Sequence, residues 1–449
     1  MLKYSIKSVS LNSITGDDRM QDLTKLNRQA LQAYAHEMQE AYQAFLDKHL
    51  SINMARGKPA PEQLDLSDAL FSLGRDQVGV RSADGIDCRN YGDLCGIPEC
   101  RALFGEVFGV PAANVIACGS SSLNLMYDYF SQCYALGVAG HEPWIKQGPC
   151  KYIAIVPGYD RHFAIAAHFG LELVSVPMTP TGPDVDRIRE LVKDPSVKGM
   201  FCVPKYSNPD GITYSDDTVE ALAALKPAAP DFRVIWDEAY LIHDLYGEKD
   251  ELKNIFDAAK KYGNEDLFVA FASTSKITFA GAGVAAIAAS DANVKEICGR
   301  LTIQIISYDK INQLKHAYFY KTKADLEAQM ARHAEILRPK FDAVLQGLRD
   351  GLQGAGVASF NAPKGGYFIS LDVNVGSARR VGELCKAAGL TLTPVGATYP
   401  YGKDPNDANI RIAPSCPSVE ELRVATALLT TAVKLAACEA LLEKTEAQA

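Results

Sequence analysis

The chain has 449 residues, of which 47% are hydrophobic and 22% are charged, a composition typical of a globular protein with more than one domain. Its 46 basic and 54 acidic side chains give a formal net charge of -8, and no run of Lys or Arg marks a nucleic-acid surface. We therefore expect no nucleic-acid partner, and we find no apolar run that indicates a membrane span.

The N-terminus and the cysteines bear on the cellular compartment. The stretch MLKYSIKSVSLNSITGDD lacks the apolar block of a secretory signal, although its lysines and serines, with no acid before Asp17, leave an organelle transit segment open. The eleven cysteines lack the spacing of a metal site, so we expect free thiols and no bound metal. These features favour a reducing cytoplasm.

The hydrophobic spacing of the chain changes along its length. One long helix is predicted over 22–50, and from about residue 112 short β-branched runs alternate with helical stretches. Such alternation predicts a mostly parallel sheet covered on both faces by helices. After about residue 325, a long helix leads into a second alternating set, and Ser418 with Glu421 forms a capping box that begins a closing helix.

This order of elements predicts an α/β protein with three parts. The first is an N-terminal segment, 1–85, that packs with the small domain. The second is a large domain over 86–325, and the third is a smaller α+β domain over 326–449. In parallel sheets the ligand binds beyond the carboxyl ends of the strands, so we look for chemistry there.

Polar residues follow four of the predicted strands. They are Tyr159 and His162 in IAIVPGYDRH, Asn208 in FCVPKYSNPDG, Asp237 and Tyr240 in VIWDEAY, and Lys276 in VAFASTSK. Each alone is a weak signal, because Asp after a strand is commonly a helix cap and N-P-D-G is a turn sequence. Their arrival at one edge of the sheet is what indicates a site.

This set of residues suits pyridoxal 5'-phosphate. The amine of Lys276 would form a Schiff base with the cofactor aldehyde, and Asp237 would keep the pyridine nitrogen protonated. Asn208 and Tyr240 would donate hydrogen bonds to the ring oxygen, while Tyr159 would stack on the ring. A glycine followed by three serines at a helix N-terminus would bind the phosphate; these serines are Ser120, Ser121 and Ser122.

Two other interpretations of Lys276 stay open on this stretch alone. Ser273 and Lys276 satisfy the S-x-x-K pattern of serine hydrolases, but the chain lacks the accompanying S-D-N and K-T-G motifs. An isolated lysine can also be an ordinary surface residue.

The ordered motifs of the chain resemble those of fold-type I pyridoxal-phosphate aminotransferases, and in particular the divergent subgroup Ic aspartate aminotransferases. The resemblance extends from about Ile52 to the last helix. It rests on INMARGKPAPEQLDLS, NYGDLCGIPECRALF, GSSSLNLMYD, PGYDRHF, YSNPDGITYS, WDEAYLIHDL, STSKITFAGAG, KGGYFISLD and NIRIAPS. It implies a seven-stranded, mostly parallel sheet in the large domain.

The resemblance also implies roles for residues at the matching positions. Lys276 corresponds to the lysine that holds the cofactor, Arg411 to the arginine that clamps the substrate α-carboxylate, and Gly57 and Asn208 to further substrate contacts. Ser120, Ser121 and Ser273 match phosphate-binding positions. Tyr91 resembles a tyrosine that reaches the neighbouring subunit's site, so a homodimer is expected. The sequence departs from the family at Val284, where many members carry a phosphate-binding arginine.

The expected reaction is transfer of the amino group of L-aspartate to 2-oxoglutarate. The sequence does not show which cation binds the side-chain carboxylate of the substrate; the candidates are Arg56, Arg161, Lys205 and Lys315. Alternatives are an aminotransferase of other specificity, for example for alanine, or a lyase or racemase with the same cofactor. A non-catalytic regulator with an aminotransferase-like domain is disfavoured, because only about fifty residues, mostly one helix, precede the resemblance.

Overall fold

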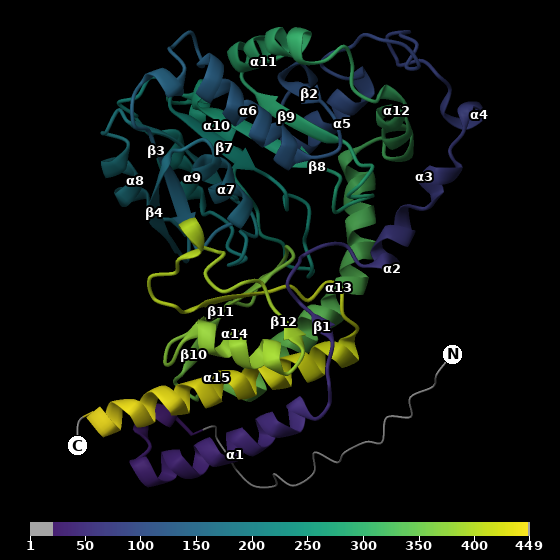
Figure 1. The fold of residues 1–449 in the computed structure, drawn as a ribbon. Helices are drawn as coiled ribbons and strands as arrows, with labels where there is room; N and C mark the ends of the chain where they lie inside the picture. Colours follow the sequence, from purple (N-terminus) through teal and green to yellow (C-terminus); the bar gives the residue numbers. More distant parts are fainter. Residues whose placement is uncertain (1–20, 448–449) are drawn as a thin grey trace.

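The computed structural model describes residues 21–447, and its α/β architecture confirms the predicted fold class (Figure 1). A large sheet with its helices fills the upper half of Figure 1, and a smaller α+β unit lies below it. We call these the large and small domains. Helix α13 (Lys323–Leu352) runs from one to the other. The transit segment that the sequence leaves open lies outside the described residues.

The large sheet has the strand order β2-β9-β8-β7-β6-β3-β4-β5. Strands β4, β3, β6, β7 and β8 pair in parallel, whereas β9 is antiparallel to both of its neighbours. The bounds are β2 (Val115–Ala117), β3 (Lys151–Val156), β4 (Glu172–Thr179), β5 (Gly182–Pro183), β6 (Val197–Cys202), β7 (Arg233–Asp237), β8 (Phe268–Ser273) and β9 (Ala285–Ala289).

The sheet has eight strands rather than the seven expected. The additional strand is β5, because Gly182 and Pro183 turn back and pair with the end of β4. A two-residue hairpin of this kind carries no hydrophobic alternation that a sequence pattern could reveal.

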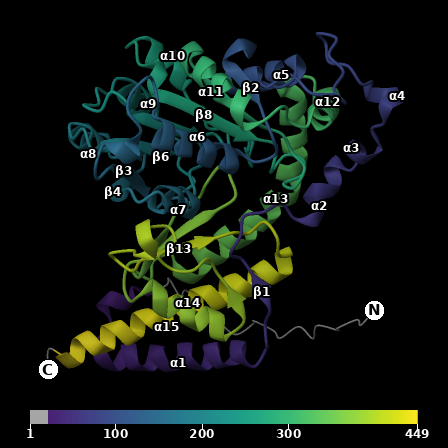
Figure 2. The same cartoon turned by 45° about the horizontal axis from the view of Figure 1, so that its top comes forward.

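Both faces of the large sheet are covered, which explains why its central strands are buried and mostly apolar. Every residue of β6 and β7 is buried. Val234 and Trp236 of β7 join one hydrophobic cluster with α5, α8, α9 and α10, while Ile235 joins another with α6, α7 and α11. Figure 2 shows the helices in front of and behind the strands.

Helices of the large domain follow the strands, as the alternating pattern predicts. They are α5 (Pro98–Phe108), α6 (Ser122–Leu136), α7 (Asp160–His168), α8 (Val185–Leu191), α9 (Asp216–Ala223), α10 (Ile255–Lys260), α11 (Asp291–Gln304) and α12 (Lys310–Phe319). Helices α6 and α7 begin at the carboxyl ends of β2 and β3, so their N-termini face the edge where a ligand is expected.

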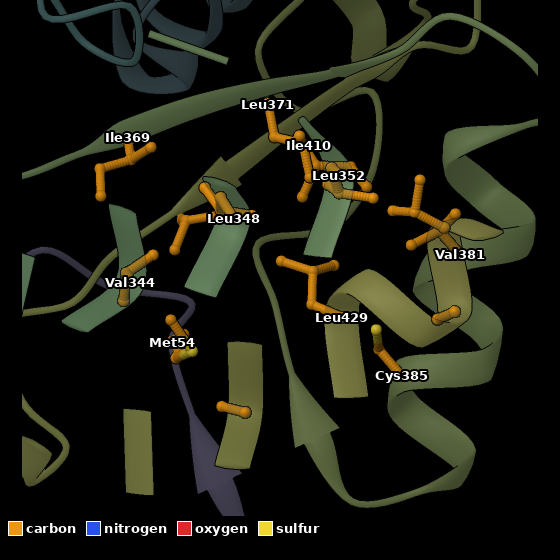
Figure 3. Close-up of a cluster of buried hydrophobic side chains, with 14 of the residues drawn as sticks. Met54, Val344, Leu348, Leu352, Ile369, Leu371, Val381, Cys385, Ile410 and Leu429 are labelled. Atoms are coloured by element: carbon orange, nitrogen blue, oxygen red, sulfur yellow. The ribbon is translucent and has the colours of Figure 1, made fainter. Parts of the chain in front are cut away.

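The small domain combines an antiparallel sheet of order β10-β11-β13 with a two-stranded pair of β1 and β12. Leu348, Ile369, Ile410 and Leu429 lie among the buried side chains that join its sheet to α13 and α15 (Figure 3). The elements are β1 (Ile52–Asn53), β10 (Ala358–Phe360), β11 (Ile369–Val373), β12 (Leu390–Thr391), β13 (Asn409–Ile412), α14 (Ala378–Ala387) and α15 (Val419–Ala447). Arg411 is paired with Ser370 across β13 and β11.

The N-terminal segment crosses both domains. Helix α1 (Arg28–Leu46) packs on α15, and it is shorter than the predicted helix because Asn27 caps it by accepting a hydrogen bond from the Ala30 N–H. Beyond β1, the short helices α2 (Pro61–Leu64), α3 (Ala69–Ser72) and α4 (Arg75–Val78) follow, and α3 and α4 pack on α12 of the large domain.

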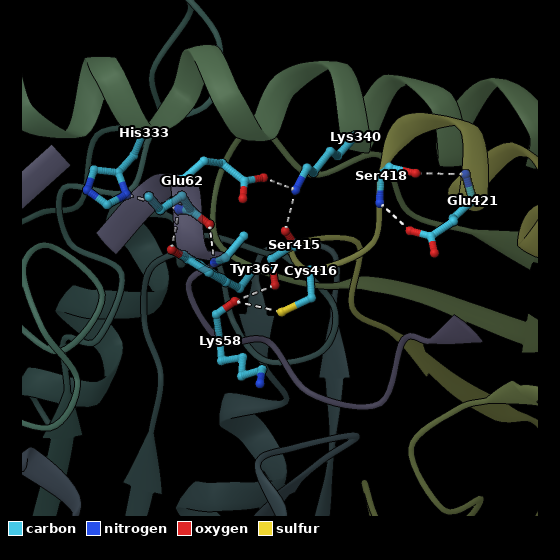
Figure 4. Close-up of polar contacts among 11 residues, drawn as sticks. Lys58, Glu62, His333, Lys340, Tyr367, Ser415, Cys416, Ser418 and Glu421 are labelled. Atoms are coloured by element: carbon cyan, nitrogen blue, oxygen red, sulfur yellow. Dashed lines mark hydrogen bonds and ion pairs between the residues drawn. The ribbon is translucent and has the colours of Figure 1, made fainter. Parts of the chain in front are cut away.

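Polar contacts fix the chain between β1 and α2 (Figure 4). Lys340 of α13 donates hydrogen bonds to Glu62 (2.7 Å) and to the Ser415 carbonyl (2.8 Å), and Ser415 Oγ donates to the Lys58 carbonyl (2.7 Å). Nearby, Ser418 and Glu421 bond each other's backbone N–H groups, which confirms the predicted capping box. Residues 56–58 are thereby held against the small domain.

Among residues 21–447, α15 is long and apolar enough to cross a membrane by length and composition, but 67% of its apolar window is buried inside the protein, so it is a core helix here. One sequence-based expectation is wrong. Cys95 and Cys298 form a disulfide, with Cα atoms 6.4 Å apart, where only free thiols were expected. The two cysteines are 203 residues apart in sequence, so no local spacing could have paired them.

Candidate active site

A cavity of about 560 Å³ lies at the carboxyl edge of the large sheet, where the two domains meet. Its walls come from the ends of β7 and β8, the N-termini of α6 and α7, the segment 55–58, and the small domain around Thr393 and Arg411. The parallel strands therefore bring together residues that are far apart in the sequence, as expected.

Asp237, the last residue of β7, lies on the cavity floor and is 3% exposed. Its Oδ2 is 3.1 Å from Nε2 of His162, whose ring stacks on Phe201 at 4.4 Å between centroids. Its Oδ1 is buried and has no hydrogen-bond partner among residues 21–447. A buried carboxylate oxygen without a donor is costly, so the site is built for a donor that arrives with a ligand.

Lys276 follows β8 and also lines the cavity. Its Nζ lies 5.1 Å from the centroid of the Tyr240 ring. Burial lowers the pKa of the Lys276 amine, although the charge of Asp237 works in the opposite direction. A lowered pKa favours the neutral amine, which is the form that attacks a carbonyl carbon.

Three further residues predicted from the strand ends line the same cavity: Tyr159, Asn208 and Tyr240. Asn208 Oδ1 accepts a hydrogen bond from Arg411 Nη1 (3.2 Å), so its amide group is left to donate. Burial raises the pKa of Tyr159 to about 12 and that of Tyr240 well above its usual value. Both phenols are therefore neutral donors at neutral pH.

Four serines also line the cavity: Ser121, Ser122, Ser273 and Ser275. Ser121 caps α6 by accepting a hydrogen bond from the Asn124 N–H (3.3 Å). The first N–H groups of α6 then point at the cavity and suit an anion. Ser120 does not line the cavity; its carbonyl accepts a hydrogen bond from Ser275 Oγ (3.2 Å).

Val284 occupies the position where many family members carry arginine. It is 1% exposed, packs in the core of the large domain, and donates its N–H to Thr274 Oγ1 (2.9 Å). This position therefore supplies no cation to the serine end of the cavity.

Arg411 approaches the cavity from β13 of the small domain. Its guanidinium lies 4.9 Å from the Phe368 ring centroid. Its Nε donates to Thr393 Oγ1 (3.3 Å), and its Nη1 donates to Asn208 and to Asp160 Oδ1 (3.0 Å). The sequence does not reveal Asp160 or Thr393 as partners, although Asp160 stands in the PGYDRHF motif beside two residues that it singled out.

Gly57 lines the cavity beside Phe368, whereas Tyr91 does not line it. A Cβ added at Gly57 would lie 2.5 Å from Cζ of Phe368, so this glycine allows the ring to sit under Arg411. Tyr91 is 73% exposed on the protein surface.

The structure reduces the four candidate cations to two. Arg56 and Arg161 line the cavity, and neither forms an ion pair with a carboxylate of residues 21–447. Lys205 does not line it; its Nζ bonds Asp244 (3.0 Å) and the Leu241 carbonyl (2.9 Å). Lys315, on α12, does not line it either.

The cavity also contains Lys58, which the sequence reading missed although it follows Arg56 and Gly57 in one motif.

The serine-hydrolase interpretation lacks its geometry. Ser273 Oγ donates to Ser275 Oγ (3.0 Å), and among residues 21–447 no hydrogen bond joins a serine hydroxyl to Nζ of Lys276. A nucleophilic serine needs its base within hydrogen-bond reach.

The sequence of this chain is similar to those of known aminotransferases, in agreement with the residues that line the cavity. The family model for aspartate amino-transferases matches residues 26–445. An aspartate aminotransferase of Corynebacterium glutamicum is 46% identical over 407 residues, which cover 90% of this chain and 94% of that protein.

Solved structures agree as well. The crystal structure of an aspartate transaminase from Corynebacterium glutamicum superposes with a TM-score of 0.91 at 44% identity, over 94% of this chain and 99% of that chain. The α-aminoadipate aminotransferase of Thermus thermophilus shares the fold at 20% identity, with a TM-score of 0.67 over 88% of this chain and 94% of that one.

These matches span nearly the whole chain, and they agree with a cavity that joins a buried lysine, a buried aspartate and an arginine at the edge of a parallel sheet. The chain belongs to the aspartate aminotransferase family.

Proposed function

We propose that the protein is a pyridoxal-phosphate-dependent aminotransferase that moves the amino group of L-aspartate to 2-oxoglutarate, giving oxaloacetate and L-glutamate. The observation that carries this proposal is the unpartnered Oδ1 of Asp237 in the same cavity as Lys276 and Arg411. A protonated pyridine nitrogen is a donor that would satisfy this oxygen.

The remaining residues of the cavity also fit pyridoxal 5'-phosphate. Lys276 would hold it covalently, Asn208 and Tyr240 would donate hydrogen bonds to its ring oxygen, and Tyr159 would stack on the ring. Ser121, Ser122 and Ser273 would bind the phosphate together with the N-terminus of α6; we include Ser120 through its backbone N–H, because its side chain does not line the cavity. When bound, the cofactor supplies an electron sink for the pair left at the substrate Cα as its proton leaves.

The chain's own residues then have distinct tasks. Nζ of Lys276, whose pKa is lowered by burial, accepts the proton that leaves the substrate Cα. Arg411 binds the α-carboxylate and fixes which Cα bond faces Lys276. His162 holds Asp237 through Oδ2 and leaves Oδ1 for the cofactor. The tyrosines and Phe368 exclude water around the reacting atoms.

We assign the second substrate carboxylate to Arg161. It stands in the first turn of α7, directly after Asp160, whose side chain reaches Arg411. A cation on a helix is positioned more precisely than one on a loop, and Arg56 lies on the loop between β1 and α2.

The proposal is tested by mixing the cofactor-loaded protein with a panel of amino acids and following the absorbance of the lysine-bound cofactor. Aspartate and glutamate should exceed alanine, leucine and phenylalanine in kcat/KM by at least about a hundredfold, because a neutral side chain leaves the second cation unpaired. Comparable efficiency with alanine would remove aspartate from the proposal and leave the transfer chemistry in place.

The Arg161→Gln variant isolates the specificity contact. We expect kcat/KM for aspartate to fall by about tenfold to a hundredfold, the effect of losing one or two charged hydrogen bonds, with little change for alanine. Arg56→Gln is the matched control, because it removes an equal charge from the same cavity. A larger selective loss in the control than in Arg161→Gln would transfer the role to Arg56.

The proposal extends to assembly and compartment. A homodimer is supported by Tyr91, which is 73% exposed and does not line the cavity of its own chain, so it is accessible to a second subunit. The nine described cysteines outside the disulfide, eight of them buried, suit a reducing cytoplasm.

A further inference from the structure

Arg411 already holds a carboxylate that belongs to the chain itself. Asp160 Oδ1 lies 3.0 Å from Arg411 Nη1, and the two residues are 251 positions apart in the sequence. Asp160 begins α7 of the large domain, whereas Arg411 lies on β13 of the small domain, so this ion pair crosses the cavity wall from one domain to the other.

Three of the five N–H donors of Arg411 are used. Nε donates to Thr393, and Nη1 donates to both Asn208 and Asp160, so Nη2 alone has no hydrogen-bond partner among the described residues. A two-point contact with a carboxylate needs adjacent N–H groups on two of these nitrogens. A substrate carboxylate therefore has to replace one of the three existing partners.

Asp160 is the partner suited to leave. Asn208 and Thr393 are buried, at 4% and 6% exposed, whereas the Asp160 side chain is 35% exposed and lines the cavity. It is also the only anion of the three, so an arriving carboxylate replaces it without leaving the buried guanidinium uncompensated. Once released, Asp160 stays in the first turn of α7, where the helix N-terminus favours a negative charge.

We infer that Asp160 is an internal competitor of the substrate: it neutralises Arg411 in the empty site, and the substrate α-carboxylate displaces it. This inference rests on the proposed role of Arg411 as the receptor of that carboxylate. The consequence is selectivity for carboxylates, because only a ligand with a carboxylate at this point can compensate the charge of Arg411 once Asp160 has been displaced.

The test compares cofactor-loaded wild-type protein with Asp160→Asn and Asp160→Ser, using succinate as an unreactive dicarboxylate in titration calorimetry. If Asp160 occupies Arg411 about nine-tenths of the time, its removal should tighten succinate binding about tenfold and lower KM for aspartate by a similar factor. Asp216→Asn is the matched control, because Asp216 is likewise the first residue of a helix, α9, but lies outside the cavity. Unchanged thermal unfolding establishes that each variant is folded.

Two further variants, Arg411→Gln alone and Arg411→Gln combined with Asp160→Asn, test the competitor role of Asp160 separately from the proposed role of Arg411. In an Arg411→Gln background the gain from Asp160→Asn should vanish, because no cation is left to compete for. If Arg411→Gln leaves succinate binding unchanged, the proposed role of Arg411 fails. If Arg411→Gln weakens binding but Asp160→Asn and Asp160→Ser leave it unchanged or weaken it, Asp160 positions Arg411, and only the competitor role is overturned.

Discussion

Replacing Lys276 by Ala should reduce transamination by about ten-thousandfold or more. The substitution removes both the covalent attachment of the cofactor and the base at the substrate Cα, and positioned proton transfer alone contributes up to about that factor. The fold should survive, because Nζ of Lys276 makes no hydrogen bond or ion pair with residues 21–447 and only faces the Tyr240 ring. Thermal unfolding of the cofactor-free variant should match the wild type.

Borohydride reduction followed by peptide mass spectrometry provides a readout that does not depend on turnover. Wild-type protein should carry the reduced cofactor on the peptide that contains Lys276, and the variant should carry none. Lys315→Ala is the matched control, because Lys315 lies outside the cavity, and it should keep both label and activity. A label retained in Lys276→Ala would exclude Lys276 as the attachment site.

A substitution of Ser273 separates the aminotransferase interpretation from the serine-hydrolase interpretation. Ser273→Ala should weaken cofactor binding at the phosphate end while leaving measurable turnover. Loss of all activity with the cofactor fully bound would return Ser273 to the role of nucleophile.

Much of the candidate site could be predicted because a parallel sheet gathers its strand ends. Asp237 and Lys276 directly follow buried apolar runs, and the α/β pattern alone brings such residues to one edge. Local helix capping could also be predicted. Ser418 and Glu421 are three residues apart, and each side chain accepts a hydrogen bond from the other's backbone N–H, as the capping-box spacing predicts. In each case the information lies within a few residues.

Contacts between distant segments could not be predicted from spacing. Asp160 and Lys205 both stand in motifs at strand ends, yet Asp160 reaches Arg411 while Lys205 turns toward Asp244. Which way a charged side chain turns depends on the partner that tertiary packing offers, and that partner lies on another element. The choice between Arg56, Arg161, Lys205 and Lys315 was open for this reason.

The substitution Asp237→Asn should reduce kcat by about a thousandfold or more while leaving most of the cofactor bound. An amide cannot hold a pyridine nitrogen in its protonated form, and each unit of pKa lost there corresponds to about 1.36 kcal/mol. Binding should persist because Lys276, the serines and the N-terminus of α6 lie elsewhere in the cavity. The loss should therefore appear in kcat, at saturating cofactor, far more than in cofactor affinity.

A structural cause for such a loss can be excluded with the cofactor-free protein. Asp237 keeps one oxygen on His162, at 3.1 Å, and its other oxygen is buried without a partner among residues 21–447, so an amide of the same shape can keep the contact with His162 while it removes a buried negative charge. The unfolding temperature of cofactor-free Asp237→Asn should therefore be no lower than that of the wild type. Asp237→Glu, which keeps the charge but moves it, should retain more activity than Asp237→Asn. Turnover of Asp237→Asn within about tenfold of the wild type would show that the pyridine nitrogen needs no anion here, and the electron-sink role of Asp237 would have to be abandoned.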